Sequence, residues 1–531
     1  MDGSSIPRWP AGSESSSTGH LQSGATTVRA VAVAAPHLAK KFLAASAALT
    51  SATPFSLLNA MRGAIARIDQ PASAWARSNW KRPAGLPIFM ADDLRSALEW
   101  TDAIIDAEQP NLFLIGAMSL ALPGAIAIAK RVRERLGETV TIVLGGKHVT
   151  ETLWADGEAT IIHPAAPYDV DGIALFDLLV SGDGEEVIAE IGEVVAAGYH
   201  GTAFERALVR RLERARGSFV ALFKSGESVI SRGTPIDHEA LPFVHDFYPV
   251  NAKFGVFGGA PTAHLYSYTS RGCVMRCGFC SENALINGPV NVAALEKGAD
   301  LLAAQVEHLN AVYGQQRIAG FVEDSILLQA HGPAWLKFAD QIERRGARMP
   351  FGAQLTVDIV LDARRREALQ RLASVGLEYV FMGIETANEA VAASMSKNTA
   401  RRSQRSWSQR SRAAIASLSD MGVSTGVSVL FGLGEDRDDR EAMFMTLRSM
   451  REELGQPRVV SLNWATRHPM RDPETGNVDY QRWGVDAGDP RAPMMAQLFG
   501  EASVNQAFVA APTMGDLQHI AHRVAELELA P

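Results

Sequence analysis

The chain has 531 residues, of which 47% are apolar and 21% are charged, and its formal net charge is -8. A chain of this length holds roughly two to four domains, and its composition is that of a folded globular protein. The acidic balance gives no overall attraction to nucleic acid or to anionic lipid surfaces. We therefore expect no nucleic acid and no membrane among its partners.

All the cysteines of the chain lie in one short segment, at positions Cys273, Cys277 and Cys280. Three clustered thiols cannot form a disulfide framework, and thiolate clusters survive best in reducing surroundings. The serine-rich N-terminus has no basic segment followed by an apolar run, and no segment is apolar over the ~18 residues that a membrane span needs. These features predict a cytoplasmic protein.

The first part of the chain alternates short apolar runs with helical patterns. Residues 1–24 are mostly small and polar, so we expect a disordered tail there. Strands are predicted over residues 28–35, 111–116, 140–144 and 178–180, with helices over 38–68, 92–107 and 123–136. This alternation predicts an α/β fold with a doubly wound parallel sheet of the Rossmann type, which we assign to residues 25–200.

Ligands of doubly wound sheets bind beyond the carboxyl ends of the strands. Two of the loops predicted there are rich in glycine, which lets the backbone approach a bulky ligand. The candidate ligand-binding residues of these loops are Ser119, Gly145, Gly146, His148 and Gly182.

Residues 201–260 are predicted to form a basic helix, a hairpin that turns at Ser225 and Gly226, and a proline-rich linker. Beyond them, strands are predicted over 264–268, 318–322, 353–357, 379–384, 424–431 and 459–464, with helices over 292–312, 334–344, 364–375, 411–421 and 440–454. Six strands with five intervening helices predict a partial (β/α)6 barrel over residues 261–465. Residues 466–531 are predicted to form a small C-terminal extension with one helix over 514–527.

The C-x3-C-x2-C spacing suits a four-iron cubane in which one iron lacks a protein ligand and can bind a substrate or cofactor. A zinc site with a histidine as fourth ligand is the alternative, although closed zinc sites usually show two paired sets of ligands. Buried thiols without a metal fit less well, because Arg271, Arg276 and Glu282 make the segment polar.

With Phe279 before the last cysteine, the motif reads C-x3-C-x-aromatic-C directly after the first predicted barrel strand, and it resembles the radical S-adenosylmethionine (SAM) superfamily. The resemblance implies a [4Fe-4S] cluster held by Cys273, Cys277 and Cys280, whose free iron binds SAM. An electron, supplied by a reductant such as flavodoxin or ferredoxin, would cleave SAM to a 5'-deoxyadenosyl radical that abstracts hydrogen from a substrate. The protein would supply ligation, orientation and exclusion of water.

Further segments are similar to the superfamily in order and spacing. An acidic strand end follows the second strand, a Gly-Ile-Glu-Thr segment with a later lysine ends the fourth, and a Gly-Leu-Gly-Glu segment without the family's proline follows the fifth. A glutamate at a strand end is otherwise a capping or salt-bridged group. The residues that the resemblance assigns to SAM are Phe279, Glu323, Asp324, Gln354, Glu385, Gly432, Gly434 and Glu435.

A doubly wound domain ahead of such a barrel resembles the cobalamin-binding subclass, whose Gly-Gly-x-His-x-Thr segment matches residues 145–150. Residues 182–185 match its Gly-Glu-Gly-Glu segment, with Asp183 in place of a glutamate. The chain lacks Asp-x-His-x-x-Gly, so no ligand below the cobalt is assigned. His148 as a loop histidine bonded to nearby backbone is an equal alternative. Glu185 and Glu186 are interpreted as charge at a helix N-terminus.

Two further groups of residues stand near predicted strand ends. Five arginines between 401 and 412, among them Arg410, are predicted to form a solvated face. Trp464, Arg467 and His468 follow the last barrel strand and are weak candidates for substrate contact, because aromatic residues there also serve as lid packing.

Together these resemblances imply a cobalamin-dependent radical SAM methyltransferase that acts on an unactivated carbon of a small-molecule or natural-product substrate. One SAM would methylate cobalamin and a second would yield the radical. A non-methylating rearrangement, cyclisation or oxidation in the same subclass is the alternative among enzymes. A non-catalytic iron-sulfur or zinc binding module is the alternative outside them. No catalytic residue and no particular substrate follow from the sequence.

Overall fold

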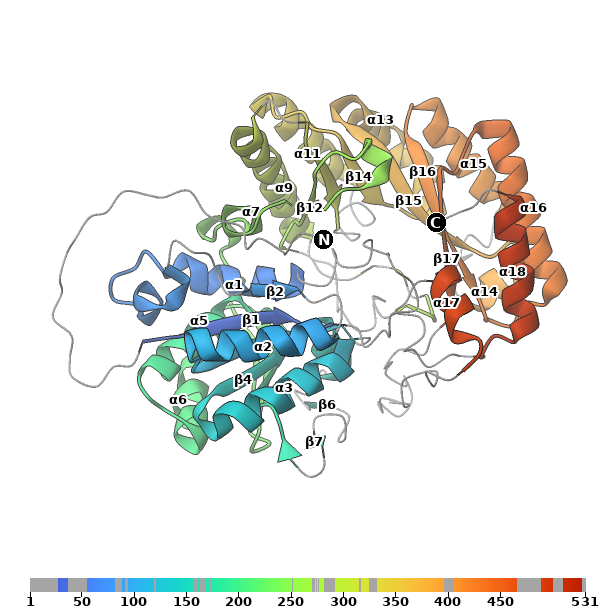
Figure 1. Ribbon diagram of the computed structural model, residues 1–531. Helices are drawn as coiled ribbons and strands as arrows, with labels where there is room; N and C mark the ends of the chain where they lie inside the picture. The colour runs from blue at the N-terminus through green and yellow to red at the C-terminus, as the bar shows by residue number, and fades with distance from the viewer. Residues whose placement is uncertain are drawn as a thin grey trace. The chain divides into compact units, whose positions relative to one another are not determined.

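The computed structural model describes residues 27–36, 55–81, 88–90, 94–118, 121–155, 161–162, 169–170, 173–250, 252–269, 273, 275, 277–280, 292–314, 317–323, 332–395, 405–465, 489–499 and 510–527. The chain divides into two compact units. The first comprises Met1–Lys41, Ala45–Pro249 and Pro469–Gln481, and the second comprises Phe42–Ala44, Val250–His468 and Arg482–Pro531. Figure 1 labels the helices and strands of both.

A seven-stranded sheet in the order β11-β10-β9-β4-β3-β1-β2 forms the centre of the first unit. Five strands are parallel, so the predicted doubly wound parallel sheet is confirmed: β1 (Ala30–Ala34), β2 (Ile88–Met90), β3 (Leu112–Gly116), β4 (Thr141–Gly145) and β9 (Leu178–Gly182). All residues of β1 and β3 are buried, which explains their continuous apolar sequences.

The hairpin predicted to turn at Ser225 and Gly226 is present, and the structure shows that it is part of this sheet. Its strands, β10 (Ser218–Phe223) and β11 (Ser228–Arg232), run antiparallel, and β10 pairs with β9. The hairpin thereby supplies the hydrogen-bond partners that the edge of β9 would otherwise lack. The proline spacing after the hairpin could not reveal this pairing, because it depends on a contact distant in sequence.

Helices pack in pairs in the first unit. Helix α1 (Phe55–Ala66) contacts α5 (Glu185–Ala196), and α2 (Leu94–Glu108) contacts α3 (Leu122–Leu136). Alternate residues of β1, Val31 and Val33, share one apolar core with residues of α2 and α3. The unit also contains α4 (Lys147–Thr152), α6 (Gly201–Leu212), α7 (Val244–Phe247) and the short strand pairs β5 (Trp154–Ala155) with β6 (Ile161–Ile162) and β7 (Asp169–Val170) with β8 (Ile173–Ala174).

The strand order of the first unit reverses between β1 and β3, because β2 lies on one side of β1 while β3, β4 and β9 extend on the other. Ligands of doubly wound sheets bind beyond the carboxyl ends of the strands at such a reversal. Here Ala35 donates its backbone N–H to Gly116 O at 2.8 Å, which joins the two strands at that point. We call the side of a sheet where its parallel strands end the carboxyl edge.

A six-stranded sheet in which neighbouring strands are parallel and follow chain order forms the second unit, so the predicted partial barrel is confirmed. Its strands are β12 (Thr262–Leu265), β13 (Ala319–Val322), β14 (Phe351–Gln354), β15 (Leu377–Glu385), β16 (Ser424–Phe431) and β17 (Val459–Trp464). Strand β14 ends earlier than predicted because Thr356 accepts a hydrogen bond from Ile359 N and starts α12 (Val357–Leu361).

The predicted helices between the strands are also present, and one core cluster joins them to the sheet. They are α9 (Val292–Tyr313), α11 (Gly332–Arg345), α13 (Arg366–Val375), α15 (Trp407–Asp420) and α16 (Arg437–Leu454). The structure adds α14 (Glu389–Ser394) and α17 (Ala492–Phe499), which the sequence did not predict, and confirms the last helix as α18 (Met514–Glu526). In the described part of the chain, none of the helices combines the length and apolarity needed to cross a membrane.

Candidate cluster and cofactor site

The cysteine segment follows β12, and helix α9 fixes its first residues. Gln305 Nε2 donates to Tyr266 O at 2.5 Å, and Tyr266 N donates to Gln305 Oε1 at 3.3 Å. Thr269 Oγ1 donates to Ala294 O at 2.6 Å. Gly298 leaves room for this contact, because a Cβ at that position would lie 2.5 Å from Thr269 Oγ1. The chain therefore enters the segment from a fixed position.

Cys277 is buried, while Cys273 and Cys280 are half-buried. The backbone N–H of Met275 donates to Cys273 Sγ at 3.4 Å, a contact that favours the charged thiolate. Gly278 N donates to Met395 O at 3.2 Å and so ties the loop to the end of α14. Three thiols on one tethered loop, with an amide donor to one sulfur, form a donor set that fits an iron-sulfur cluster.

Two non-glycine residues with positive φ lie at the carboxyl edge of the same sheet. Tyr268 (φ 61) follows β12, and Glu385 (φ 67) ends β15. Such a conformation costs about 1–3 kcal/mol and persists only where the surroundings hold it. Glu385 also lies at a shift of register between β15 and β16, a bulge of the kind that re-aims side chains beside active sites.

Glu323, directly after β13, is held by a histidine of β12. His264 Nδ1 lies 2.5 Å from Glu323 Oε1, and the His264 side chain is 2% exposed. Phe254 meets the imidazole edge-on, with 5.6 Å between the ring centroids. The carboxylate is therefore fixed at the carboxyl edge. The sequence analysis did not single out His264. In the sheet His264 pairs with Phe321, and Glu323, two residues further along, points to the same face of the strand as Phe321.

The other residues assigned to SAM on these strands follow from the parallel pairing. Gln354 ends β14 and pairs with Phe381 of β15. Because parallel strands end on one side, Gln354, Glu323 and Glu385 lie at the same edge as the cysteine loop. Phe279 is half-buried within that loop. Asp324 lies outside the described residues.

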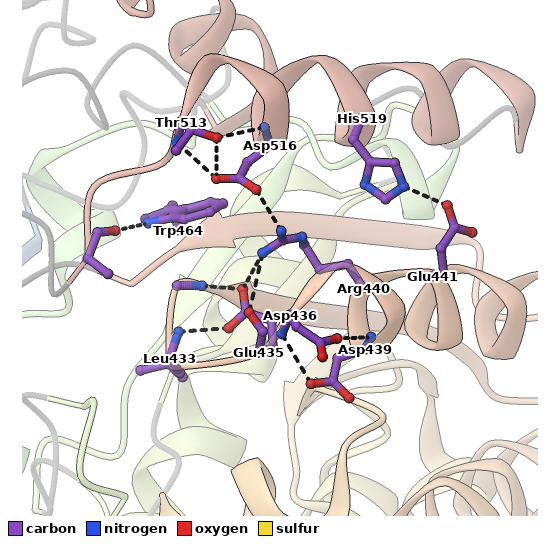
Figure 2. Close-up of polar contacts among 12 residues, drawn as sticks. Leu433, Glu435, Asp436, Asp439, Arg440, Glu441, Trp464, Thr513, Asp516 and His519 are labelled. Atoms are coloured by element: carbon purple, nitrogen blue, oxygen red, sulfur yellow. Dashed lines mark hydrogen bonds and ion pairs between the residues drawn. The ribbon is translucent and has the colours of Figure 1, made fainter.

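The loop after β16 is shaped by the carboxylate of Glu435 (Figure 2). Gly432 N donates to its Oε1 at 2.6 Å, and Leu433 N donates to its Oε2 at 2.8 Å. The Glu435 side chain is only 4% exposed. The structure thus places this predicted SAM residue as a support of its own loop, with its oxygens turned inward.

The two glycines of this loop differ in their surroundings. Both have positive φ, 83° at Gly432 and 102° at Gly434. A Cβ at Gly432 would lie 2.4 Å from Trp464 Nε1, whereas a Cβ at Gly434 would have no atom of the described residues within 4 Å. Among the described residues, the loop backbone is thus less crowded at Gly434 than at Gly432. Trp464 itself is buried and donates from Nε1 to Ala510 O at 2.6 Å, so it serves as packing.

In the first unit, the loops after β3 and β4 are joined by their own backbones. Ala117 N donates to Gly145 O at 3.0 Å, and His148 N donates to Ala117 O at 2.9 Å. Gly146 has φ 94, and a Cβ there would lie 2.8 Å from Ala117 O. This glycine is required by the approach of the two loops, whatever ligand binds beyond them.

Gly182 has a similar structural reason. Its φ is 84, and a Cβ would lie 2.3 Å from Ser218 O of β10. Asp183 Oδ2 accepts from Ser218 N at 2.8 Å, so the segment predicted to meet a ligand also holds the hairpin. Among the predicted glycines of this edge, Gly145 differs, because a Cβ would make an ordinary 3.6 Å contact with Val180 O.

His148 lies in the first turn of α4 and has no exposed surface. Burial lowers the pKa of its imidazole to about 3, so the ring is neutral near neutral pH. Its place inside the unit agrees with the alternative of a histidine bonded within the protein. Glu186 lies at the start of α5 as expected and pairs with Arg67 at 3.2 Å. Ser119 lies outside the described residues.

The prediction of a solvated arginine face is wrong for Arg410. This residue is 4% exposed, forms an ion pair with Asp358 of α12, and lies 5.6 Å from the centre of the Trp407 ring. The local sequence is rich in serine and arginine, but the partner of Arg410 comes from another helix. Arg401, Arg402, Arg467 and His468 lie outside the described residues.

A family model described as the radical SAM superfamily matches residues 267–447, which include the three cysteines and the ends of strands β13 to β16. About a third of the chain therefore matches the radical SAM superfamily. The cofactors of this superfamily are a [4Fe-4S] cluster and SAM, and Cys273, Cys277 and Cys280 are the residues that would hold the cluster. The matching segment, with its cysteine loop, lies in the second unit.

Known proteins resemble this chain to different extents. A biotin synthase of Acidiphilium cryptum (strain JF-5) is 26% identical over 189 residues, which is 35% of this chain and about half (52%) of that relative. The cobalamin- and [4Fe-4S]-bound radical SAM methyltransferase TsrM of Kitasatospora setae matches with a TM-score of 0.52 and 14% identity, over 94% of this chain and 91% of TsrM. The cobalamin-dependent radical enzyme OxsB matches with a TM-score of 0.46 and 12% identity, over 79% of this chain and 52% of OxsB. The chain thus has a fold similar to that of TsrM over nearly its whole length.

Proposed function

We propose that this protein is a cobalamin-dependent radical SAM methyltransferase acting on an unactivated carbon of a small-molecule substrate. One observation carries the proposal: a doubly wound unit whose strand order reverses between β1 and β3 precedes the cluster-bearing sheet in one chain. The same fold in TsrM, a methyltransferase whose structure holds cobalamin and a [4Fe-4S] cluster, supports it.

When bound, the cluster and SAM supply an organic radical and cobalamin supplies a carrier for a methyl group. The residues of the second unit would hold and orient the cluster and SAM. The three cysteines would ligate the cluster, and Glu323, fixed by His264, would accept a hydrogen bond from the amino group of SAM. The less crowded backbone at Gly434 would face the rest of SAM.

In the first unit, the carboxyl edge between β1 and β3 is the surface we assign to cobalamin. Its described residues include the buried Ala35 and Ala117 and the half-buried Gly145, and such small residues let a broad planar ligand approach the backbone. His148 is buried, so we expect it to contribute through packing rather than as a ligand to cobalt. The proposal also needs an electron donor, for which a flavodoxin or ferredoxin is suitable.

The test begins with anaerobic reconstitution of the full chain with iron, sulfide and hydroxocobalamin, followed by desalting. We expect a retained corrinoid spectrum without the features of a bound imidazole, and 5'-deoxyadenosine when SAM and dithionite are added. With methyl-labelled SAM and a small-molecule extract, label should appear in a small molecule.

Each part of the proposal can fail separately. Loss of all corrinoid on desalting would remove cobalamin from it. Retained corrinoid and 5'-deoxyadenosine without methyl label in any product would favour a rearrangement, cyclisation or oxidation instead. Zinc in place of iron, or a cluster that never yields 5'-deoxyadenosine, would contradict radical chemistry altogether.

A further inference from the structure

Charged side chains connect the loop after β16 to the C-terminal helix α18 (Figure 2). Arg440, on α16, donates from Nη1 to Glu435 Oε1 at 3.3 Å and from Nη2 to Asp516 Oδ1 at 2.6 Å. Glu435 in turn accepts the backbone N–H groups of Gly432 and Leu433. Through Arg440 and Glu435, the carboxylate of Asp516 on α18 is thus connected to the loop assigned to SAM.

These groups are withdrawn from solvent. The side chains of Glu435 and Arg440 are 4% and 10% exposed, and within the described part of the chain Arg440 Nε is buried without a hydrogen-bond partner. A buried ion pair contributes little net stability, because desolvation offsets the attraction. Removing one partner is nevertheless costly, since the other charge stays buried. Such an arrangement is better suited to fixing a position than to stabilising the fold.

The far end of the connection is itself fixed. Asp516 Oδ2 accepts from Thr513 N at 2.9 Å and Asp516 N donates to Thr513 Oγ1 at 3.1 Å, and these two bonds form the capping box that starts α18. A second contact comes from the same segment, because Ala510 O accepts from Trp464 Nε1 and the indole lies against Gly432. Residues 510–516 therefore hold the loop from two sides.

Another contact joins the same two helices without touching the loop. Glu441, next to Arg440 on α16, accepts from His519 Nε2 at 2.5 Å and also pairs with Arg523 of α18. Figure 2 shows the Glu441–His519 pair farther along both helices than the Arg440–Asp516 pair. It provides a matched control, because its loss weakens the docking of α18 and leaves Glu435 and Arg440 in place.

We infer that Arg440 and Asp516 are positioning residues for SAM: they hold residues 432–435 in the shape that receives the cofactor. The inference rests on the assignment of this loop to SAM in the proposed function. It gives the C-terminal segment a specific role in cofactor binding, which the sequence presented only as an extension.

The experiment compares SAM binding to cluster-loaded full-length protein by equilibrium dialysis with labelled SAM. The variants are Arg440→Gln, Asp516→Asn and the control Glu441→Gln. We expect Arg440→Gln to raise the Kd for SAM roughly tenfold or more, since it removes charge-assisted hydrogen bonds to Glu435. Asp516→Asn should have a smaller effect of the same sign, because Arg440 still contacts Glu435. Iron content should match the wild type.

Hydrogen exchange over residues 432–436 supplies a reading that is independent of turnover. The loop amides should exchange faster in Arg440→Gln and Asp516→Asn than in the wild type. Their exchange rates should be unchanged in Glu441→Gln. Equal SAM affinity in Arg440→Gln and wild type, or an equal loss in Glu441→Gln, would overturn the inference. If wild type binds SAM but transfers no methyl group, the proposed reaction fails while the inference stands. If the cluster-loaded wild type binds no SAM, the proposed function and the inference fail together.

Discussion

The carboxyl edges of the two sheets differ in the residues that form them. In the second unit the edge carries thiols, the fixed Glu323 carboxylate and a bulge that presents Glu385 at positive φ. In the first unit the described residues of the corresponding edge include Ala35, Ala117, Gly145 and Gly146, and backbone hydrogen bonds such as Ala117 N to Gly145 O join its loops. The edge of the second unit thus presents thiols and a fixed carboxylate, and the edge of the first unit is shaped by close approach of its backbone.

The difference indicates how the work is divided in a protein of this fold. An edge that must hold a cluster and a charged cofactor needs ligands and fixed charges, which are costly to position. An edge that carries a large preformed cofactor needs shape, because that cofactor brings its own reactive centre. At the carboxyl edge of the second sheet, positive φ is adopted by the non-glycine residues Tyr268 and Glu385, whereas in the loops of the first sheet it is adopted by Gly146 and Gly182.

The cluster loop gives the sharpest test of this contrast. Cys273→Ala, Cys277→Ala or Cys280→Ala should each abolish SAM cleavage, while the fold stays largely intact because the ligands sit on a loop. Formation of 5'-deoxyadenosine, iron content and circular dichroism measure these outcomes. Cleavage at the wild-type rate by any of these variants would show that the side chains of this edge do not hold the cluster.

Glu323 tests whether the fixed carboxylate binds a cofactor. Glu323→Gln should weaken SAM binding by about 10- to 100-fold, because a charge-assisted hydrogen bond is lost. His264→Phe should weaken it less, since the carboxylate remains but is no longer fixed. The control is Glu378→Gln near the start of β15, where Glu378 is exposed and pairs with Arg317 at 3.7 Å. If all three variants bind SAM equally well by equilibrium dialysis, Glu323 has no role at the site.

The backbone character of the first edge predicts a different response. Gly146→Ala should lower the free energy of unfolding by the ~1–2 kcal/mol that positive φ costs an alanine. It should lower it further because the added Cβ would meet Ala117. Gly198→Ala, where φ is 78 and no atom of the described residues lies within 4 Å of the added Cβ, should lose only the part that comes from positive φ. Urea unfolding measures both. Equal losses would mean that the two loops separate easily and that the edge is not preformed.

His148 gives the smallest expected effect, a dependence of stability on pH. In the folded protein the pKa of His148 is about 3, below its ordinary value of 6.5. Between these two pH values the imidazole is protonated in the unfolded chain and neutral in the folded protein. Stability should therefore fall as pH falls from 6.5 toward 3, with a slope approaching about 1.4 kcal/mol per pH unit. His148→Gln should remove this part of the slope in unfolding curves at pH 7 and pH 5. A slope that His148→Gln leaves unchanged would show that the imidazole is in contact with solvent. Loss of bound corrinoid in this variant would support His148 as a cobalamin ligand.

Much of the fold was predictable because its signals are local. The apolar runs of β16 and β17 were predicted with the boundaries that the structure shows, and α18 was predicted to within one residue. The errors came where local pattern competes with packing. Residues 353–357 were predicted as one strand, whereas the Thr356 cap starts α12 there. The β10–β11 hairpin was predicted, but its pairing with β9 was not.

By itself, the sequence determined the order of strands and helices, the cysteine motif and the resemblance to the radical SAM superfamily, since spacing and periodicity are properties of neighbouring residues. Only the tertiary structure decided which glycines serve the protein's own backbone, that His148 is buried, and that His264 and Arg440 contact Glu323 and Glu435. The physical reason is that their partners are distant in sequence: Glu323 lies 59 positions from His264 and Asp516 lies 76 from Arg440. Such pairs meet only when parallel strands and packed helices bring their elements together.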